Sequence, residues 1–422
     1  MSVKYLVGDV FDRMAELEDG SVDLILTSPP FLALRSYLPA DHPDKDKEIG
    51  SEPTPAEFVD TLLRLSAEWR RLLTPHGSIC VELGDTFAGS GGSGGDYNEN
   101  GLREGQPQFR QMASREHRPE REGTGADGGP RTVPTNGGRG WPLAKSLTLT
   151  PEAYRFALAY GINPHTGTKS PAGQWRVRNV VRWVRPNPPV GALGDKFRPA
   201  TSELVVAAVS KDRWFDLDAV REPYAVATEE RNKPGSAPRG IWREGRKEND
   251  TALTVAEAVS THAGAPPLDW WKISPKGYAG AHYAVWPSEL CVKPIKAMCP
   301  REVCRDCGQP RRRITEPNYV GAKSGQPYEA HVWASSVQDG KAAHTAKRPD
   351  EGARSLPKTV GWSDCGHDNW RPGLVLDPFA GTGTTLAVAH GHSRDAIGID
   401  IDERNADLAR ERVGGLFLEV VL

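Results

Sequence analysis

The stretch Asp377-Pro378-Phe379-Ala380-Gly381-Thr382-Gly383-Thr384-Thr385 decides the fold, because it joins a short apolar strand to a helix expected over residues 383–390. Glycines at such a turn let the backbone approach a ligand closely and direct the N–H groups of the helix toward it. A P-loop requires Lys after its last Gly, where Thr384 stands, and a dinucleotide fingerprint requires a third Gly, where Leu386 stands. The turn therefore predicts a ligand that is neither a nucleoside triphosphate nor a dinucleotide.

A second motif, Thr27-Ser28-Pro29-Pro30-Phe31, follows the apolar strand Val22–Leu26. Ligands of open α/β sheets bind at the carboxyl ends of the strands, where this motif lies. Two consecutive prolines hold the backbone rigid and present carbonyl groups without N–H groups. Such a segment suits a site that accepts hydrogen bonds from an amino group while Phe31 stacks on a base.

The pattern around these motifs is that of an α/β protein. Apolar strands are expected over 3–9, 22–26, 78–83, 176–184, 203–209 and 396–399, and amphipathic helices over 55–73, 151–160 and 403–412. Nearly continuous apolar strands alternating with helices indicate a mostly parallel sheet covered on both faces. Trp270 and Trp271 are expected in the core, with stacking on a base as the alternative.

Together the two motifs resemble those of the DNA amino-methyltransferases. The resemblance implies an S-adenosylmethionine-dependent, Rossmann-like fold in which the glycine turn passes under the methionine part of the cofactor. The implied cofactor-binding residues are Asp9 at the adenine, Asp400 at the ribose, and Asp377, Phe379, Gly381, Gly383 and Thr384 in the turn. The implied catalytic residues are Ser28, Pro29, Pro30 and Phe31, with Ser28 and the Pro29 carbonyl accepting hydrogen bonds from the target amino group.

The order of the motifs resembles the circularly permuted β class of that family, because the catalytic tetrad precedes the cofactor turn. Val81–Thr86, Lys145–Leu147, Arg182–Pro188 and His282–Pro287 also resemble that class. The order predicts a catalytic half of the core over 1–88, a flexible Gly-rich insertion over 89–140, a continuation of the core over 141–221, a target-recognition region over 222–280, a returning core segment over 281–300, a zinc-ribbon insertion over 301–369 and a cofactor-binding half over 370–422.

Ser at position 28, rather than Asp or Asn, favours cytosine N4 as the acceptor, with adenine N6 as the alternative. Methylation at cytosine carbon 5 is excluded, because it uses a nucleophilic Cys, usually after Pro, and the sequence has no Pro-Cys dipeptide. RNA and protein amides are less favoured acceptors. The alternative from another class is a DNA-binding module that retains the methyltransferase fold without turnover; the intact tetrad and turn argue against it.

A metal site is indicated by Cys304-x2-Cys307 and Cys365-Gly366-His367. Three Cys and one His form a usual structural Zn²⁺ set, although residues 308–364 separate the two halves. Cys299 is an alternative ligand, and reduced cysteines in a loop are the alternative interpretation. Arg311, Arg312 and Arg313 beside this site are either phosphate contacts or a solvated basic face.

Composition bounds the remaining possibilities. The 422 residues carry a formal net charge of -2, which disfavours a globally basic, histone-like protein and confines any DNA contact to a local surface. Gly 44 and Pro 35 make up about a fifth of the chain, against about 12% on average, which indicates long loops around a smaller core. With neither a secretory signal nor an apolar run of membrane-spanning length, a cytoplasmic protein is expected. Its expected partners are double-stranded DNA and a cognate restriction endonuclease.

Overall fold

The computed structural model describes residues 1–34, 37–38, 41–88, 139–188, 195–223, 264–275, 286–320, 354–415 and 417–421. The chain divides into two compact units. Unit 1 comprises residues 1–215, 268–311 and 365–422, and unit 2 comprises residues 216–267 and 312–364. The described residues leave out most of three predicted segments: the Gly-rich insertion, the target-recognition region and the stretch His282–Pro287.

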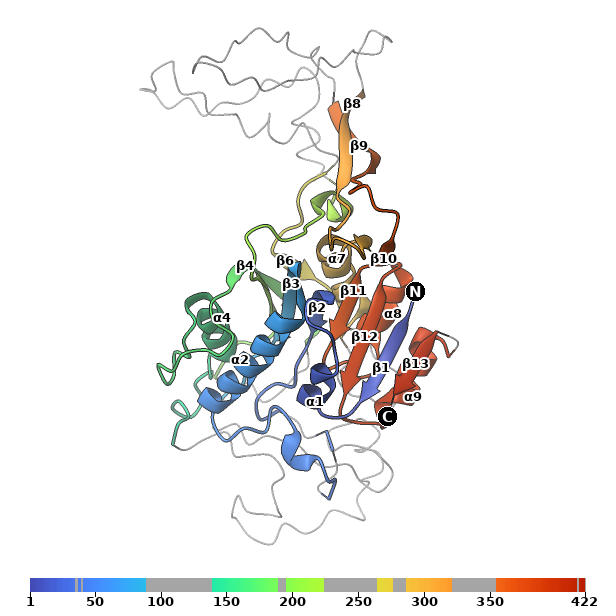
Figure 1. Ribbon diagram of the computed structural model, residues 1–422. Coiled ribbons are helices and arrows are strands. Elements are labelled where there is room, and N and C mark those ends of the chain that lie inside the picture. Colours follow the sequence, from blue (N-terminus) through green and yellow to red (C-terminus); the bar gives the residue numbers. More distant parts are fainter. Residues whose placement is uncertain are drawn as a thin grey trace, which may run out of the picture. The chain divides into compact units, whose positions relative to one another are not determined.

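Unit 1 is built on a mixed sheet. In the described part of the chain its order is β13 (Leu418–Val421), β1 (Val3–Val7), β12 (Asp395–Asp400), β11 (Leu374–Asp377), β2 (Val22–Thr27), β3 (Leu73–Leu83), β5 (Thr201–Ala208), β4 (Arg176–Val184) and β6 (Trp270–Lys272). The strands from β13 to β3 pair in parallel, whereas β5 is antiparallel to both β3 and β4. Strands from the two ends of the chain thus alternate, and Figure 1 shows β1 between β12 and β13.

The helices of unit 1 fall into two groups, each of which packs within itself. One group contains α1 (Val10–Ala15), α2 (Pro55–Leu72) and α4 (Thr150–Tyr160), and the other contains α7 (Ser288–Met298), α8 (Thr384–Gly391) and α9 (Arg404–Val413). Every residue of β2 is buried, as a parallel strand between two helical layers requires. No helix of the described residues is long and apolar enough to cross a membrane.

Local sequence explains where α2 begins. Thr54 adopts an extended conformation, and its hydroxyl accepts a hydrogen bond from the Glu57 backbone N–H at 3.3 Å. Pro55 occupies the first helical turn, where its missing N–H costs nothing. The helix then buries Phe58, Leu62 and Trp69 on one face.

The described residues also include two short antiparallel strand pairs and two 3₁₀ helices. In unit 1, β7 (Glu302–Cys304) pairs antiparallel with β10 (Trp370–Pro372), and a short 3₁₀ helix, η1, spans Lys45–Lys47. Unit 2 contains the antiparallel pair β8 (Arg313–Val320) and β9 (Arg354–Trp362) and a 3₁₀ helix, η2 (Leu217–Val220).

The expectation that Trp270 and Trp271 lie in the core is wrong for Trp270. Both belong to β6 at the edge of the sheet, where side chains alternate between faces. Trp270 is 50% exposed, and Trp271 is half-buried, with its indole N–H donating to the Leu268 carbonyl at 2.9 Å. Their apolar character alone did not distinguish an edge strand from a central one.

Candidate active site

The carboxyl ends of β2 and β11 meet at the centre of the sheet. The two strands are parallel neighbours, with Leu24 opposite Val375 and Ile25 opposite Leu376. From β11 the chain continues through α8 to β12 on one side, and from β2 it continues through α2 to β3 on the other. At such a reversal of strand order, ligands of open α/β sheets bind in the crevice beyond the strand ends.

Asp377 joins the two predicted motifs directly. Its Oδ1 accepts hydrogen bonds from the Thr27 hydroxyl at 2.6 Å and from the Phe379 N–H at 3.1 Å, and its Oδ2 accepts one from the Thr385 hydroxyl at 2.6 Å. Burial raises the pKa of Asp377 to about 6, although these three donors lower it. The side chain therefore locks the first residue of the glycine turn to the residue preceding Ser28.

The glycine turn needs its glycines. Gly381 and Gly383 have φ values of +50° and +73°, in the left-handed region that disfavours side chains. The Gly381 carbonyl accepts from the Tyr5 hydroxyl at 2.7 Å, and the Gly381 N–H donates to Asp400 Oδ2 at 2.8 Å. Thr382 is buried, and its hydroxyl has no hydrogen-bond partner within the described chain.

Asp400 lies at the end of β12, as predicted. Its Oδ1 accepts hydrogen bonds from the Asp402 N–H at 2.9 Å and from the Asn405 Nδ2 at 3.0 Å. Burial raises the pKa of Asp400 to about 6. The carboxylate is held at the edge of the crevice, beside the turn that contains Gly381.

Two predicted cofactor residues have structural partners of their own. Asp9 caps α1, and its Oδ1 accepts from the N–H groups of Phe11 at 2.9 Å and Asp12 at 3.1 Å. It follows β1, the parallel neighbour of β12, so it lies on the same sheet edge as Asp400. Thr384 begins α8 with a buried side chain, and its hydroxyl accepts a hydrogen bond from Arg412 of α9. The structure thus assigns Thr384 a helix-to-helix contact.

The Ser-Pro-Pro-Phe segment follows β2 on the other side of the crevice. Ser28 is half-buried and Pro29 is buried. The Phe31 ring lies against Gly84, so closely that a Cβ at position 84 would come within 2.6 Å of it. At Gly50, whose φ is +93°, a Cβ would come within 3.0 Å of the Phe31 carbonyl oxygen and 3.1 Å of Pro30 Cβ. Two glycines therefore make room for the prolines and the aromatic ring.

Glu82 is a candidate site residue that was not expected among the catalytic residues, although it lies in Val81–Thr86, a stretch that resembles the β class. It is only 3% exposed in β3, and its Oε2 accepts a hydrogen bond from the Ser28 hydroxyl at 2.6 Å. Burial raises the pKa of Glu82, whereas hydrogen bonds from Ser202 and Ser28 and the charge of Arg185 lower it. The sequence feature that pointed to Glu82 is its place as an acidic residue inside the apolar strand 78–83, because a buried carboxylate requires partners.

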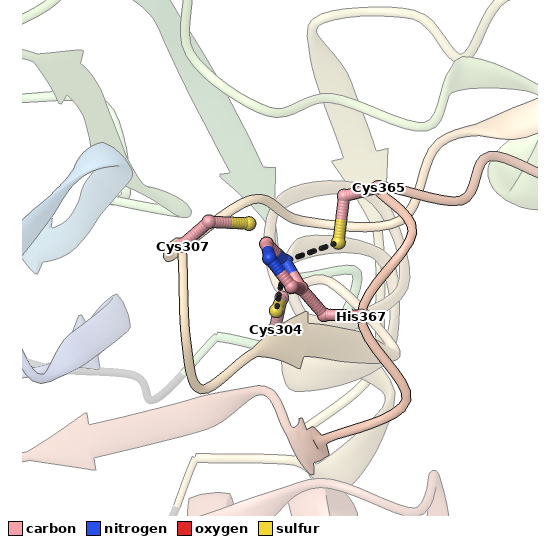
Figure 2. Close-up of side chains that lie close together, drawn as sticks. All are labelled: Cys304, Cys307, Cys365 and His367. Atoms are coloured by element: carbon pink, nitrogen blue, oxygen red, sulfur yellow. Dashed lines mark hydrogen bonds between the residues drawn. The ribbon is translucent and has the colours of Figure 1, made fainter.

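The four predicted metal ligands also come together, away from the tetrad and the glycine turn in the sequence. Cys304, Cys307, Cys365 and His367 each present one ligand atom to a common centre in unit 1 (Figure 2). Two of the neighbouring arginines have partners within the chain. Arg311 pairs with Glu302 at 3.2 Å, and Arg313 pairs with Asp216 at 2.8 Å.

A family model described as DNA methylase, of the N6/N4 type, matches residues 22–411. This chain belongs to that family. The match spans the tetrad, Glu82, the glycine turn and Asp400, whereas Tyr5 and Asp9 precede it.

Relatives with curated descriptions are distant. The chain is 22% identical to the Type II methyltransferase M.SmaI of Serratia marcescens over 98% of this chain and 91% of that protein. It is 26% identical to M.SfiI of Streptomyces fimbriatus over 57% of this chain, but only 44% of that protein's length is matched. Among solved structures, the cytosine-N4-specific PvuII DNA methyltransferase aligns with a TM-score of 0.44 and 12% identity, covering 99% of this chain and 95% of that one.

Proposed function

We propose that this DNA methylase transfers a methyl group from S-adenosylmethionine to the exocyclic N4 of a cytosine flipped out of double-stranded DNA, and that it has the permuted β-class order. The observation that carries the proposal is the hydrogen bond from the Ser28 hydroxyl to buried Glu82, at the strand end beside Asp377. Because the serine proton is committed to Glu82, the remaining lone pairs of Ser28 can only accept. They would accept from an amino group such as cytosine N4.

The glycine turn fits the cofactor. Gly381 has a φ of +50° and carries no side chain where the methionine part would pass, whereas Gly383 makes room for Ala409 of α9, whose Cβ lies 3.0 Å from the position of an added Cβ. The buried Thr382 hydroxyl lacks a partner within the described chain, and a bound polar group would supply one. Asp400 presents a carboxylate suited to ribose hydroxyls, as acidic residues do in other nucleoside-binding folds. When bound, S-adenosylmethionine supplies a methyl group on a positively charged sulfur, a good leaving group.

The chain's own residues position the amino group and remove its proton. Ser28 and the Pro29 carbonyl would accept the two N4 hydrogens, which directs the nitrogen lone pair toward the methyl group. As the new N–C bond forms, N4 would release one proton to Ser28, whose own proton passes to Glu82. A raised pKa makes the Glu82 carboxylate a better proton acceptor than a free one. Phe31 would stack on the flipped base.

Cysteine-based attack at carbon 5 finds no support in the site. Cys80 lies on β3, but burial raises the pKa of its thiol to about 12, which disfavours the nucleophilic thiolate. Cys291 is also fully buried, and burial raises its thiol pKa well above the usual value. An exocyclic nitrogen, which needs no covalent enzyme intermediate, agrees with these surroundings.

The deciding experiment compares genomic DNA from cells expressing the wild-type chain, Ser28→Ala or Ser21→Ala. Ser21 lies just before β2, at the opposite end from the tetrad, and is the matched control. Mass analysis of nucleosides should detect N4-methylcytosine with the wild type and Ser21→Ala, and none with Ser28→Ala. N6-methyladenine instead would retain the mechanism and overturn the choice of base. No modified base from folded, S-adenosylmethionine-binding protein would favour the non-catalytic binding module.

Site specificity is tested on the same DNA. The relatives are Type II methyltransferases by name, so we propose that this chain modifies one short recognition sequence that a cognate endonuclease would cut. Single-molecule sequencing should place the modified bases in one motif. Modification without a common motif would contradict this part of the proposal.

A further inference from the structure

Four soft ligand atoms converge in unit 1 from two segments that are far apart in the sequence. Cys304 ends β7, Cys307 follows in the next turn, and Cys365 and His367 precede β10. His367 Nδ1 lies 3.6 Å from the Cys304 sulfur and 3.5 Å from the Cys365 sulfur. All four ligand atoms lie within 4.8 Å of one another (Figure 2).

These separations are those of a tetrahedral metal site. With Zn–S near 2.3 Å and Zn–N near 2.05 Å, the edges of a tetrahedron are roughly 3.6 Å between sulfur and nitrogen and roughly 3.8 Å between two sulfurs. The two S–N separations agree with that geometry. Three sulfurs and an imidazole favour Zn²⁺ over Mg²⁺ or Ca²⁺, which prefer oxygen ligands.

The backbone is shaped to turn around such an ion. Gly308 and Gly366 directly follow Cys307 and Cys365, with φ values of +69° and +80°. In the first turn the Gly308 N–H donates to the Cys304 carbonyl at 3.0 Å, and the Cys304 N–H donates to the Gln309 carbonyl at 3.0 Å. A glycine in the left-handed conformation after Cys307 and after Cys365 lets the chain reverse direction while the two thiols point toward the common centre.

Contacts other than the ligands already hold the two segments together. In the β7–β10 pair, Trp370 is opposite Cys304. The Arg305 N–H donates to the Asn369 carbonyl at 2.8 Å, and the Asn369 Nδ2 donates to Asp306 Oδ1 at 3.0 Å. The three thiols and the imidazole are therefore held near one another without a metal, and this pre-organisation favours metal binding.

We propose that Cys304, Cys307, Cys365 and His367 bind one structural Zn²⁺. All four positions of the tetrahedron are filled by protein, so the ion has no open position for a hydrolytic water. In the sequence, residues 308–364 connect the two halves of this cluster, and most of them belong to unit 2. The ion would close that loop, and loops of this length gain most from closure.

The cluster is also connected to the strand that carries the tetrad. In β10, the Arg371 guanidinium donates to Asp23 Oδ2 at 2.6 Å, and Asp23 lies fully buried in β2. The Leu374 N–H donates to the same oxygen at 2.8 Å. By holding the segment before β10, the proposed zinc would keep Arg371 on Asp23 and thus support β2, the strand that ends just before Ser28.

The test measures metal in the full-length chain purified under reducing conditions without added chelator. Elemental analysis should find about one zinc per chain in the wild type, and Co²⁺ replacement should give thiolate-to-cobalt absorption. His367→Cys, which preserves four ligands, should retain the metal, whereas His367→Ala should lose most of it. Cys299→Ala is the control, because Cys299 is buried outside the cluster and was the alternative ligand; it should retain full zinc.

The proposal is overturned if the wild type contains no zinc and takes up neither Zn²⁺ nor Co²⁺ after reduction. Full zinc content in His367→Ala would overturn the ligand set, and zinc loss in Cys299→Ala would assign Cys299 to it. The wild-type measurement decides the question even if a variant fails to fold. Since no readout depends on methylation, failure here is distinguishable from failure of the proposed activity.

Discussion

Among single residues, the proposed chemistry depends on which of Ser28 and Glu82 carries the proton that lies between them. The serine is half-buried while the glutamate is buried, and hydrogen bonds from Ser202 and Ser28 both lower the pKa of Glu82. An isolated serine hydroxyl would rotate and present either a proton or a lone pair to the base. The hydrogen bond at 2.6 Å removes that freedom and makes Ser28 an acceptor.

Glu82→Gln tests this role, because the amide retains an oxygen that accepts from Ser28 but cannot take up a proton. We expect kcat to fall on the order of 10²-fold, with little change in the dissociation constant for S-adenosylmethionine. Steady-state methylation kinetics measures kcat, and calorimetry measures the dissociation constant for S-adenosylmethionine. Glu419→Gln, an exposed residue paired with Lys4 at 3.6 Å, is the matched control. Unchanged kcat in Glu82→Gln would remove Glu82 from the mechanism.

Gly84→Ala should displace the ring of Phe31, because the new methyl group would lie 2.6 Å from a ring carbon. A shift of about 1 Å in a positioning group can cost on the order of 10²-fold in rate, so we expect a loss of that size in kcat. Methylation assays would measure it beside Gly415→Ala, where no atom lies within 4 Å of the added Cβ. Equal activity of the two variants would contradict a positioning role for Phe31.

The pKa of about 6 at Asp400 predicts a pH dependence of cofactor binding. Ribose hydroxyls donate to the ionised carboxylate, so affinity should fall by up to about tenfold per pH unit below pH 6 and be flat above pH 7. The stability of the cofactor-free protein should show the opposite pH dependence. A raised carboxyl pKa means that the folded state binds more protons, so the contribution of Asp400 to stability decreases as pH rises from about 4 to 6.

Calorimetric titration of S-adenosylmethionine between pH 5 and 8 would measure this dependence. Asp400→Asn should bind more weakly at pH 8 and show a smaller slope below pH 6. Identical slopes for the variant and the wild type would assign the titration to another group, with Asp377 the next candidate, since its pKa is also about 6.

At the scale of elements, β2 is held in place by charged groups as well as by apolar packing. Asp23 is enclosed by Arg371, by His76 at 2.8 Å and by the Leu374 N–H at 2.8 Å. Burial alone would raise the pKa of Asp23, but hydrogen bonds from His76 and Arg371 outweigh it and lower the pKa. The contribution of Asp23 to stability is therefore present above its unfolded pKa near 4 and is lost as pH falls through its lower folded value.

Arg371→Met should destabilise the protein by about 3–5 kcal/mol, because it leaves the carboxylate of Asp23 buried without its cationic partner. Chemical denaturation at pH 7 would measure the loss in free energy of unfolding. Arg410→Met is the control, since Arg410 pairs with Asp407 on the surface of α9 at 2.9 Å and such pairs contribute at most about 1 kcal/mol. Similar losses in both variants would show that the buried pair has no special role.

At the scale of the whole molecule, the two ends of the chain build one sheet. The neighbours of β1 are β12 and β13, and β2 lies between β11 and β3. A fragment of residues 1–372 contains the tetrad and Glu82 but lacks β11, β12 and β13. Its β1 has neither neighbour, and one edge of β2 loses its hydrogen-bond partner, which leaves backbone groups unpaired.

We therefore expect fragment 1–372 to lack the near-ultraviolet circular dichroism and the cooperative thermal transition of the full chain. Both measurements on the full chain provide the reference. A cooperative transition in the fragment would show that the amino-terminal segment folds without the cofactor half, and would contradict the interleaved topology as the source of stability.

The pattern of residues along the chain predicted most strands and helices of unit 1, because a strand buried on both faces must be apolar along its length. The prolines at 27–31 and the glycines at 377–385 indicated a ligand site, since they restrict or free the backbone in specific ways. That this site serves a methyltransferase was implied by the resemblance of the two motifs to those of the DNA amino-methyltransferases.

The contacts of Glu82, Thr384 and Trp270 depend on tertiary structure, because their partners lie far along the chain. Glu82 meets Ser28 and Thr384 meets Arg412, while Trp270 lies in an edge strand where apolarity does not imply burial. The same holds for the hydrogen bond between Thr27 and Asp377, which are 350 positions apart. Side-chain type limits which interactions a residue can make, but strand order decides which partner it meets.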